Sequence, residues 1–198
     1  MQIAAAVSRA SRANLIELAS TPARRLGMAV AANAMLALSA HIALPLFFTP
    51  VPLTLQTFAV LLIGLTLGPS LAFSTGLLYL AEGAMGLPVF SPTGLGGIAQ
   101  LLGPTGGFLV AMPFAAAVAG FTVRAFRLRS SRFTAALVAG TMATAVSFLL
   151  GGLWFQHLLH SSLSGTATFA VVPFLPGEVI KVIAAAGIYA SLRRYVRH

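Results

Sequence analysis

Six long apolar segments dominate the chain, and short polar or Pro- and Gly-rich stretches separate them. The segments cover residues 28–48, 53–67, 70–87, 108–123, 133–155 and 177–192. An α-helix needs about 20 apolar residues to cross a hydrocarbon core roughly 30 Å thick, and most of these segments approach that length. Prolines, glycines or arginines mark their ends, as is typical of helix boundaries. The pattern predicts an all-α, polytopic membrane protein with six transmembrane helices packed in one bundle.

Composition supports a membrane protein. Hydrophobic residues make up 58% of the chain and charged residues 8%, and the mean hydropathy is +0.95. Too little polar surface remains to cover a soluble globule. The net charge of +9 would suggest nucleic acid as a partner, but nearly all basic residues are arginines clustered at segment ends, so we expect no nucleic-acid binding. The chain has no Cys, which excludes disulfides, thiolate catalysis and Cys-ligated metals.

The positions of the basic residues predict the topology. Arginines lie before the first helix, between the fourth and fifth, and after the sixth. They are Arg9, Arg12, Arg24, Arg25, Arg124, Arg127, Arg129, Arg132, Arg193, Arg194 and Arg197. The loops of opposite parity, at about 49–52, 88–107 and 156–176, contain neither Lys nor Arg. Because cytoplasmic loops carry the excess of positive charge, both chain ends are expected in the cytoplasm.

Residues 1–27 are expected to be a cytoplasmic N-terminal segment, followed by the membrane domain at 28–198. Apolar residues mix with arginines before the first span, which suits a short interfacial helix, and a frayed tail is the alternative. The arginines and the apolar run after them resemble a signal peptide, but that run has the length of a full span. We therefore expect a retained membrane anchor.

Few ionisable residues fall within the apolar segments, and each is a functional candidate because the bilayer makes charge costly. Glu178 and Lys181 are three positions apart, which places them on one face of the first turn of the last helix. They could form a structural ion pair at a helix start. Alternatively, they face an external cavity, where Glu178 accepts N–H bonds from an amide-like ligand and Lys181 attracts its carboxylate. Glu82, near the external end of the third helix, is expected to have a supporting role.

The external stretch from Gly86 to Gly107 is rich in Gly and Pro, so non-helical backbone is expected there. At membrane depth such backbone persists only where it lines a cavity or is buried in protein. The stretch is therefore expected to form a lid over a binding site, with a plain exposed loop as the alternative.

Four ordered motifs resemble the BioY family, the biotin-binding S components of energy-coupling factor (ECF) transporters. The motifs are VPLTLQ (51–56), GAMGLPVF (83–90), GPTGG (103–107) and PFLPGEVIK (173–181). The resemblance covers about residues 28–192 and implies a six-helix S-component bundle in the bacterial cytoplasmic membrane that captures biotin from outside. It also implies a membrane scaffold subunit and two cytoplasmic ATPases as partners, although some members are thought to work without them.

Combined with this resemblance, the residues suggest a partner for each polar group of biotin. Glu178 would accept the ureido N–H bonds and Lys181 would pair with the carboxylate. Further contacts are expected from Phe90, Ser91, Thr105, Gln56 and Trp154. Gln56 could instead only cap a helix, and Trp154 could be an interfacial belt residue. The family usually carries Asp where Glu178 stands, which keeps the carboxylate but adds one methylene.

Small residues on the first helix bear on partner docking, because close helix approach needs them. The family pattern of alanines four apart is met only by Gly27 and Ala31. Docking of a scaffold through this helix is thus weakly supported, and a homo-oligomer remains open.

An enzyme is the principal rival class, but the sequence shows no nucleophile with a base and an orienting acid. His157 and His160 lack the further ligands that a metal site would need. The only Lys lies outside a phosphate-binding Gly-rich loop, so any use of ATP would belong to a partner. We expect no cofactor. A solitary or ion-coupled vitamin carrier is the remaining alternative.

Overall fold

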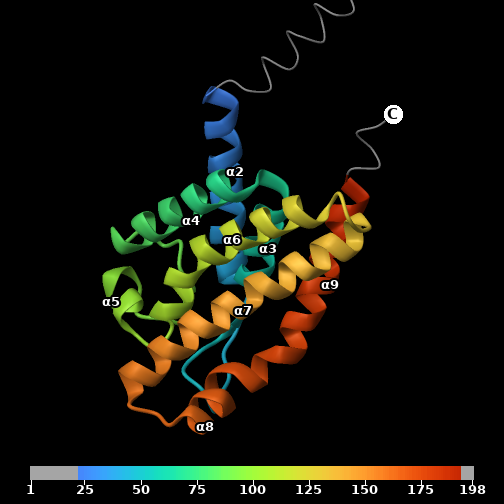
Figure 1. Cartoon of the computed structure of the whole chain (residues 1–198). Helices are drawn as coiled ribbons and strands as arrows, with labels where there is room; N and C mark the ends of the chain where they lie inside the picture. The colour runs from blue at the N-terminus through green and yellow to red at the C-terminus, as the bar shows by residue number, and fades with distance from the viewer. Residues whose placement is uncertain (1–21, 193–198) are drawn as a thin grey trace, which may run out of the picture.

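The computed structural model describes residues 22–192, and these form a bundle of helices with one very short hairpin (Figure 1). The expected interfacial helix in the N-terminal segment lies outside the described residues, apart from residues 22–27. Each of the six predicted segments contains one main helix. The predicted all-α, polytopic class is confirmed.

The first helix, α2 (Pro22–His41), ends earlier than the apolar pattern predicts. Residues 42–48 were expected to continue it, but they contain strand β1 (Ala43–Leu44), which pairs antiparallel with β2 (Leu53–Thr54). Pro45 explains the difference, because the residue before a proline is disfavoured in the α conformation. The hairpin is important for the site because it brings the backbone of Thr54 beside the last helix.

The second and third predicted segments form a tight helical hairpin. Helix α3 (Gln56–Leu67) and helix α4 (Pro69–Ala84) are joined by Gly68 alone, whose φ of +83° is strained for residues with a side chain. The side chain of Arg124 lies where a Cβ at Gly68 would be. A guanidinium at this place also complements the carbonyl end of α3.

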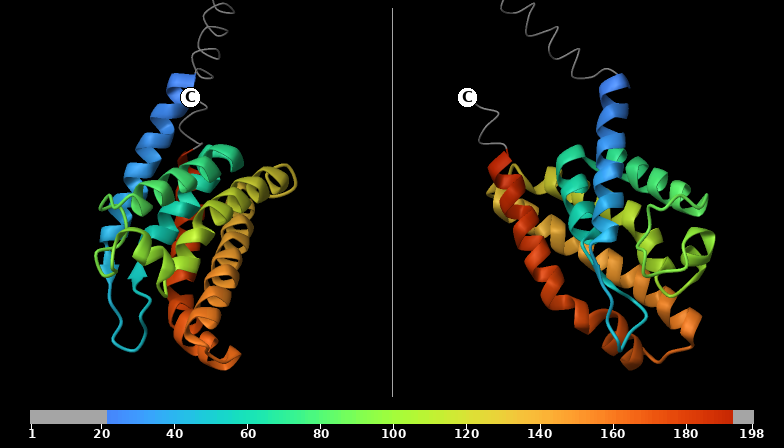
Figure 2. Two further views of the ribbon diagram at one scale, coloured as in Figure 1. Left: turned by 90° about the vertical axis from the view of Figure 1, so that its left-hand side faces the viewer. Right: turned by 180° about the vertical axis from the view of Figure 1, so that it is seen from behind.

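The Gly-rich external stretch is partly helical, which the sequence did not predict. It contains α5 (Gly97–Leu102) between two irregular segments. Two long helices follow, α6 (Gly106–Phe126) and α7 (Arg132–Leu159). They lie side by side in Figures 1 and 2.

The last helix is preceded by a run of other helical forms. One turn of α-helix, α8 (Leu163–Thr166), leads into a π-helix, η1 (Ala167–Val171), and a 3₁₀ turn, η2 (Val172–Phe174). Helix α9 (Leu175–Leu192) continues directly from them. Such changes of helical pitch are common near functional sites and re-aim the helix that follows.

Helix α6 lies at the centre of the bundle and packs against its neighbours through glycines. A Cβ at Gly76 of α4 would lie 2.7 Å from the Cα of Pro113, and a Cβ at Gly120 would lie 2.7 Å from the backbone nitrogen of Pro69. Small residues permit this close approach of helices inside a bilayer. The close contacts hold α3 and α4 against α6.

Three stretches within residues 22–192 are long and apolar enough to cross a membrane. They are α6, α7 and the continuous helical run Leu163–Leu192. Helices α3 and α4, with 12 and 16 residues, reach only about 18 and 24 Å at 1.5 Å per residue. Their contribution to the membrane domain therefore depends on packing against the longer helices.

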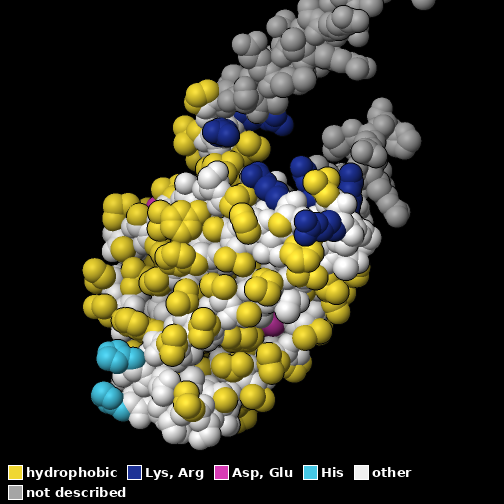
Figure 3. All heavy atoms as spheres, viewed as in Figure 1, with side chains coloured by type: hydrophobic (Ala, Val, Ile, Leu, Met, Phe, Trp, Pro, Cys, Tyr) yellow, Lys and Arg dark blue, Asp and Glu magenta, His cyan; other side chains and the backbone are white. Residues whose placement is uncertain are grey.

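The arginines among residues 22–192 gather at one end of the molecule (Figure 3). Figure 3 shows Lys and Arg side chains near the start of α2 and the turn between α6 and α7, while the opposite end shows none on this face. The described chain begins and ends on the same side (Figure 2). The predicted clustering of charge in the sequence thus corresponds to one surface of the fold.

Candidate binding site

A cavity lies between helices α3, α6, α7 and α9 and is closed on one side by the β2 strand and the external stretch. It holds about 680 Å³ of space, its open mouth included. Its lining combines eight apolar residues with ten polar or charged ones, and polar groups converging on apolar walls are typical of small-molecule sites. The lining residues are Val51, Pro52, Leu53, Thr54, Gln56, Thr57, Ser91, Gln100, Thr105, Phe108, Leu109, Met112, Thr144, Ser147, Phe148, Phe174, Glu178 and Lys181.

The start of α9 supplies the charged pair. Pro176 and Glu178 both lie in the first turn of α9, directly after the 3₁₀ turn η2. The Oε1 of Glu178 lies 2.7 Å from the Nζ of Lys181, and both charged residues are buried, with 6% and 9% of their surfaces exposed.

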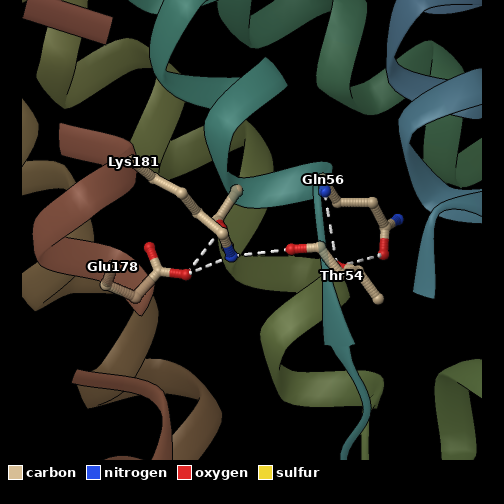
Figure 4. A network of polar contacts seen from close by, with 5 residues as sticks. Thr54, Gln56, Glu178 and Lys181 are labelled. Carbon is tan, nitrogen blue, oxygen red and sulfur yellow. Dashed lines mark hydrogen bonds and ion pairs between the residues drawn. The ribbon is translucent and has the colours of Figure 1, made fainter. Parts of the chain in front are cut away.

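Lys181 donates three hydrogen bonds, which uses all its N–H groups. Besides Glu178, it reaches the backbone oxygen of Thr54 at 2.6 Å and the hydroxyl of Thr57 at 2.9 Å. Figure 4 shows the amine pointing from α9 toward the β2 strand and the Glu178 carboxylate. Lys181 therefore joins α9 to the β2–α3 segment, and its charge is fully compensated by neighbouring groups.

The carboxylate of Glu178 is only half used. Its Oε1 accepts from Lys181 and, at 2.7 Å, from the hydroxyl of Thr57. Its Oε2 accepts no hydrogen bond from the described residues. It is also not one of their fully buried polar atoms that lack a hydrogen-bond partner. One carboxylate oxygen is thus fixed in position by two donors, while the other has no hydrogen-bond donor among the described residues.

Gln56 stands at the start of α3 and lines the cavity. Its Nε2 donates to the hydroxyl of Tyr79 at 2.6 Å, and that hydroxyl donates to the backbone oxygen of Val89 at 2.8 Å. The chain of bonds ties α3 and α4 to the external stretch. Gln56 is positioned both to contact a ligand and to hold the wall of the cavity.

The other predicted site residues fall into two groups. Ser91 and Thr105 line the cavity. Phe90 does not, since its ring packs edge-on against Tyr79 with centroids 5.3 Å apart. Trp154 is also absent from the lining, and its Nε1 donates to the backbone oxygen of Gly103 at 2.9 Å. Phe90 thus packs the external stretch against α4, and Trp154 binds the same stretch to α7.

Several polar lining residues were not singled out from the sequence. Thr144 and Ser147 face the cavity from α7, and Gln100 faces it from α5. The spacing of three between Thr144 and Ser147 in a mainly apolar helix was a detectable signal. The role of the Thr54 carbonyl was not detectable, because every residue has a carbonyl and only the fold selects this one.

Glu82 lies apart from this cavity. The Nδ2 of Asn33 donates to its Oε2 at 2.5 Å, linking α2 to α4. The Oδ1 of Asn33 is buried with no partner among the described residues. Glu82 thus occupies a position between helices, outside the lining of the candidate site.

The fold and the site together define a membrane protein of the substrate-binding type. A crystal structure described as the S-component for biotin from an ECF-type ABC transporter superposes with a TM-score of 0.79, at 25% identity, over 87% of this chain and 92% of that one. The family model for the BioY family matches residues 9–198. The chain belongs to the BioY family, as its motifs indicated.

Curated relatives agree with this assignment. The probable biotin transporter BioY of Pyrococcus horikoshii is 37% identical over 144 residues, covering 73% of this chain and 82% of the relative. The biotin transporter BioY of Rhodobacter capsulatus is 36% identical over 165 residues, covering 77% and 84%. The prediction of a transport protein rather than an enzyme is confirmed.

Proposed function

We propose that this chain captures biotin from the external side of a bacterial cytoplasmic membrane for uptake into the cell. The single observation that carries the proposal is the half-used carboxylate of Glu178, buried at the wall of a cavity that has both apolar and polar lining residues. The names of the relatives and of the superposed S-component support biotin as the ligand.

The cavity chemistry suits the parts of biotin. The ureido group offers N–H donors, and Oε2 of Glu178 is an acceptor already held in place by its partner oxygen. A charged acceptor makes a hydrogen bond roughly twice as strong as a neutral one. The rings of Phe108, Phe148 and Phe174 offer apolar walls for the bicycle and its sulfur.

Lys181 is proposed to pair with the ligand carboxylate. Its existing hydrogen bonds determine which contact must be given up for this pairing. All three of its N–H groups are engaged, so a carboxylate must replace one acceptor. The hydroxyl of Thr57 is the natural one to give way, because it is a neutral acceptor with a second partner in Glu178. Ser91, Thr105 and Gln56 are proposed as further ligand contacts.

We further propose that the chain works as the S component of an ECF transporter, with a membrane scaffold and cytoplasmic ATPases. The likeness to an S-component supports this. Gly27, Ala31 and Ala34 are exposed on α2, and a Cβ at Gly27 would meet nothing within 4 Å. Small exposed residues on one helix permit close docking of a partner helix.

The test is biotin binding by the purified, detergent-solubilised chain without partners. We expect wild-type binding that riboflavin and thiamine do not displace. Glu178→Gln should weaken it by about 1.5–3 kcal/mol, the scale of a charged hydrogen bond. The matched control is Glu82→Gln, which changes the other intramembrane glutamate outside the cavity and should leave affinity nearly unchanged. Absence of biotin binding by the wild type would overturn the proposal.

A further inference from the structure

A second, lipid-facing hollow runs between α7 and α9. This α7–α9 groove holds about 1080 Å³ of space, its open side included. It is lined by Phe133, Leu137, Thr141, Thr144, Ala145, Phe148, Leu175, Glu178, Val179, Val182 and Ile183. Figure 3 shows the surrounding face as mostly hydrophobic side chains.

The groove and the binding cavity share a wall. Thr144, Phe148 and Glu178 line both of them. These three side chains therefore lie between the cavity and the outer surface of the bundle. Whatever fills the groove completes the side wall of the site and excludes water from the carboxylate of Glu178.

The groove has the length and chemistry of an acyl-chain site. Both helices belong to stretches apolar enough to cross a membrane, so lipid is the medium outside them. From Phe133 to Phe148 the groove follows α7 for about 22 Å, at 1.5 Å per residue. One leaflet contributes about 15 Å of hydrocarbon, so a chain entering at Phe133 can follow α7 for about ten residues, to the neighbourhood of Thr144.

Positive charge lies at one end of the groove. Arg132 directly precedes Phe133, and Arg127 and Arg129 lie in the adjoining turn. Among residues 22–192 no carboxylate forms an ion pair with any of these three, since the ion pair there is that of Lys181 with Glu178. Guanidinium groups bind phosphate through paired hydrogen bonds. A cluster of cations next to a lipid-facing helix favours anionic over zwitterionic headgroups.

We propose that an anionic phospholipid occupies this place, with its phosphate against Arg127, Arg129 and Arg132 and one acyl chain in the α7–α9 groove. The lipid comes from the leaflet at the arginine end. The acyl chain covers the side of the cavity whose wall includes Thr144, Phe148 and Glu178. This inference does not depend on the identity of the ligand inside the cavity.

Fluorescence quenching by brominated lipids tests the proposal. The full chain has one Trp, so its signal is measured first and subtracted. Ile183→Trp reports from the groove, and Met142→Trp is the control outside it. Both parent residues are 50% exposed, and the contact of Gly140 with Val182 puts them at similar depth. The variants are placed in phosphatidylcholine vesicles with brominated phosphatidylglycerol or brominated phosphatidylcholine.

We expect the quenching of Ile183→Trp to give an apparent affinity about fivefold higher for brominated phosphatidylglycerol than for brominated phosphatidylcholine. The reason is the attraction of three arginines for an anionic headgroup. The Met142→Trp control should show no preference. Replacing Arg127, Arg129 and Arg132 by Gln should bring the ratio at the groove reporter to about one. Ala145→Phe, which fills the groove and leaves the arginines in place, should also reduce quenching there.

Three outcomes would overturn the proposal. Equal quenching by the two lipids at the groove reporter means that ordinary lipid fills it. The same preference at Met142→Trp means a general attraction of the surface for anionic lipid. No quenching by either lipid means that protein, such as a second copy of the chain, covers the groove.

Discussion

Burial makes Glu178 and Lys181 dependent on each other. Their 2.7 Å contact compensates two charges that would each be costly alone, and removing one partner of a buried pair is far more harmful than removing both. The pair therefore has a role in stability, and the ligand-recognition role proposed for it can be separated from that one by mutation.

Lys181→Met is expected to destabilise the protein by about 3–5 kcal/mol, because it leaves the Glu178 carboxylate buried without its counter-charge. The double variant Glu178→Gln with Lys181→Met should recover most of that loss. Thermal unfolding in detergent, without ligand, measures both. Equal destabilisation of the single and double variants would contradict the mutual dependence, and biotin binding should be lost in each.

Thr57 is the residue that connects the pair to α3. Thr57→Val keeps the shape of the side chain but removes its bonds to Lys181 and Glu178. We expect biotin affinity to fall by about 1–3 kcal/mol, because Oε1 of Glu178 then loses a fixed donor. Thr66→Val is the control, since Thr66 lies in the same helix and its hydroxyl bonds only to backbone oxygens. Titration calorimetry with biotin compares them.

At the scale of elements, the sequence predicted the main helices better than what connects them. The motif around Glu178 and Lys181 located the charged pair, because a spacing of three fixes one helical face. The β1–β2 hairpin was missed because residues 42–48, which are apolar throughout, were interpreted as the end of the first span. Thr54 could not be found as a ligand of Lys181 because its contribution is a backbone oxygen placed by that hairpin.

Two aromatic residues that were predicted for the site also show that the sequence alone does not fix which side chains reach the cavity. Phe90 and Trp154 carry strong sequence signals, yet the structure places them behind the cavity wall. Sequence identifies a chemically notable residue, while its distance from a ligand depends on how α5 and the external stretch fold over α6. The contribution of Thr144 from α7 depends likewise on the crossing of α7 and α9.

Close packing of α6 with α4 gives a prediction for the bundle. Gly76→Ala is expected to destabilise it by about 1–3 kcal/mol, because the new methyl group would overlap Pro113. Gly187→Ala in α9 is the matched control. A Cβ there meets nothing within 4 Å, so this change should be neutral or slightly stabilising through helix propensity. Thermal unfolding midpoints of the two variants and the wild type, measured in one detergent, test this prediction.

At the scale of the whole molecule, the arginine-rich end is proposed to face the cytoplasm. The chain lacks Cys, so single cysteines can be introduced without removing others. Leu128 in the basic turn and Leu163 near the opposite end are 86% and 75% exposed. We expect a membrane-impermeant maleimide to label Leu163→Cys on intact cells and to label Leu128→Cys only after permeabilisation. The reverse pattern would invert the proposed orientation.

The bond from Lys181 to Thr54 joins residues separated by 127 positions, which has a consequence for biosynthesis. A ribosome releases β2 and α3 into the membrane long before it has made α9. Until the final helix arrives, no nascent chain can hold the ligand, and the short α3 has no full span with which to insert unaided. If the chain captures biotin as proposed, only chains that include α9 can do so, and a truncated product without this helix does not compete for the vitamin.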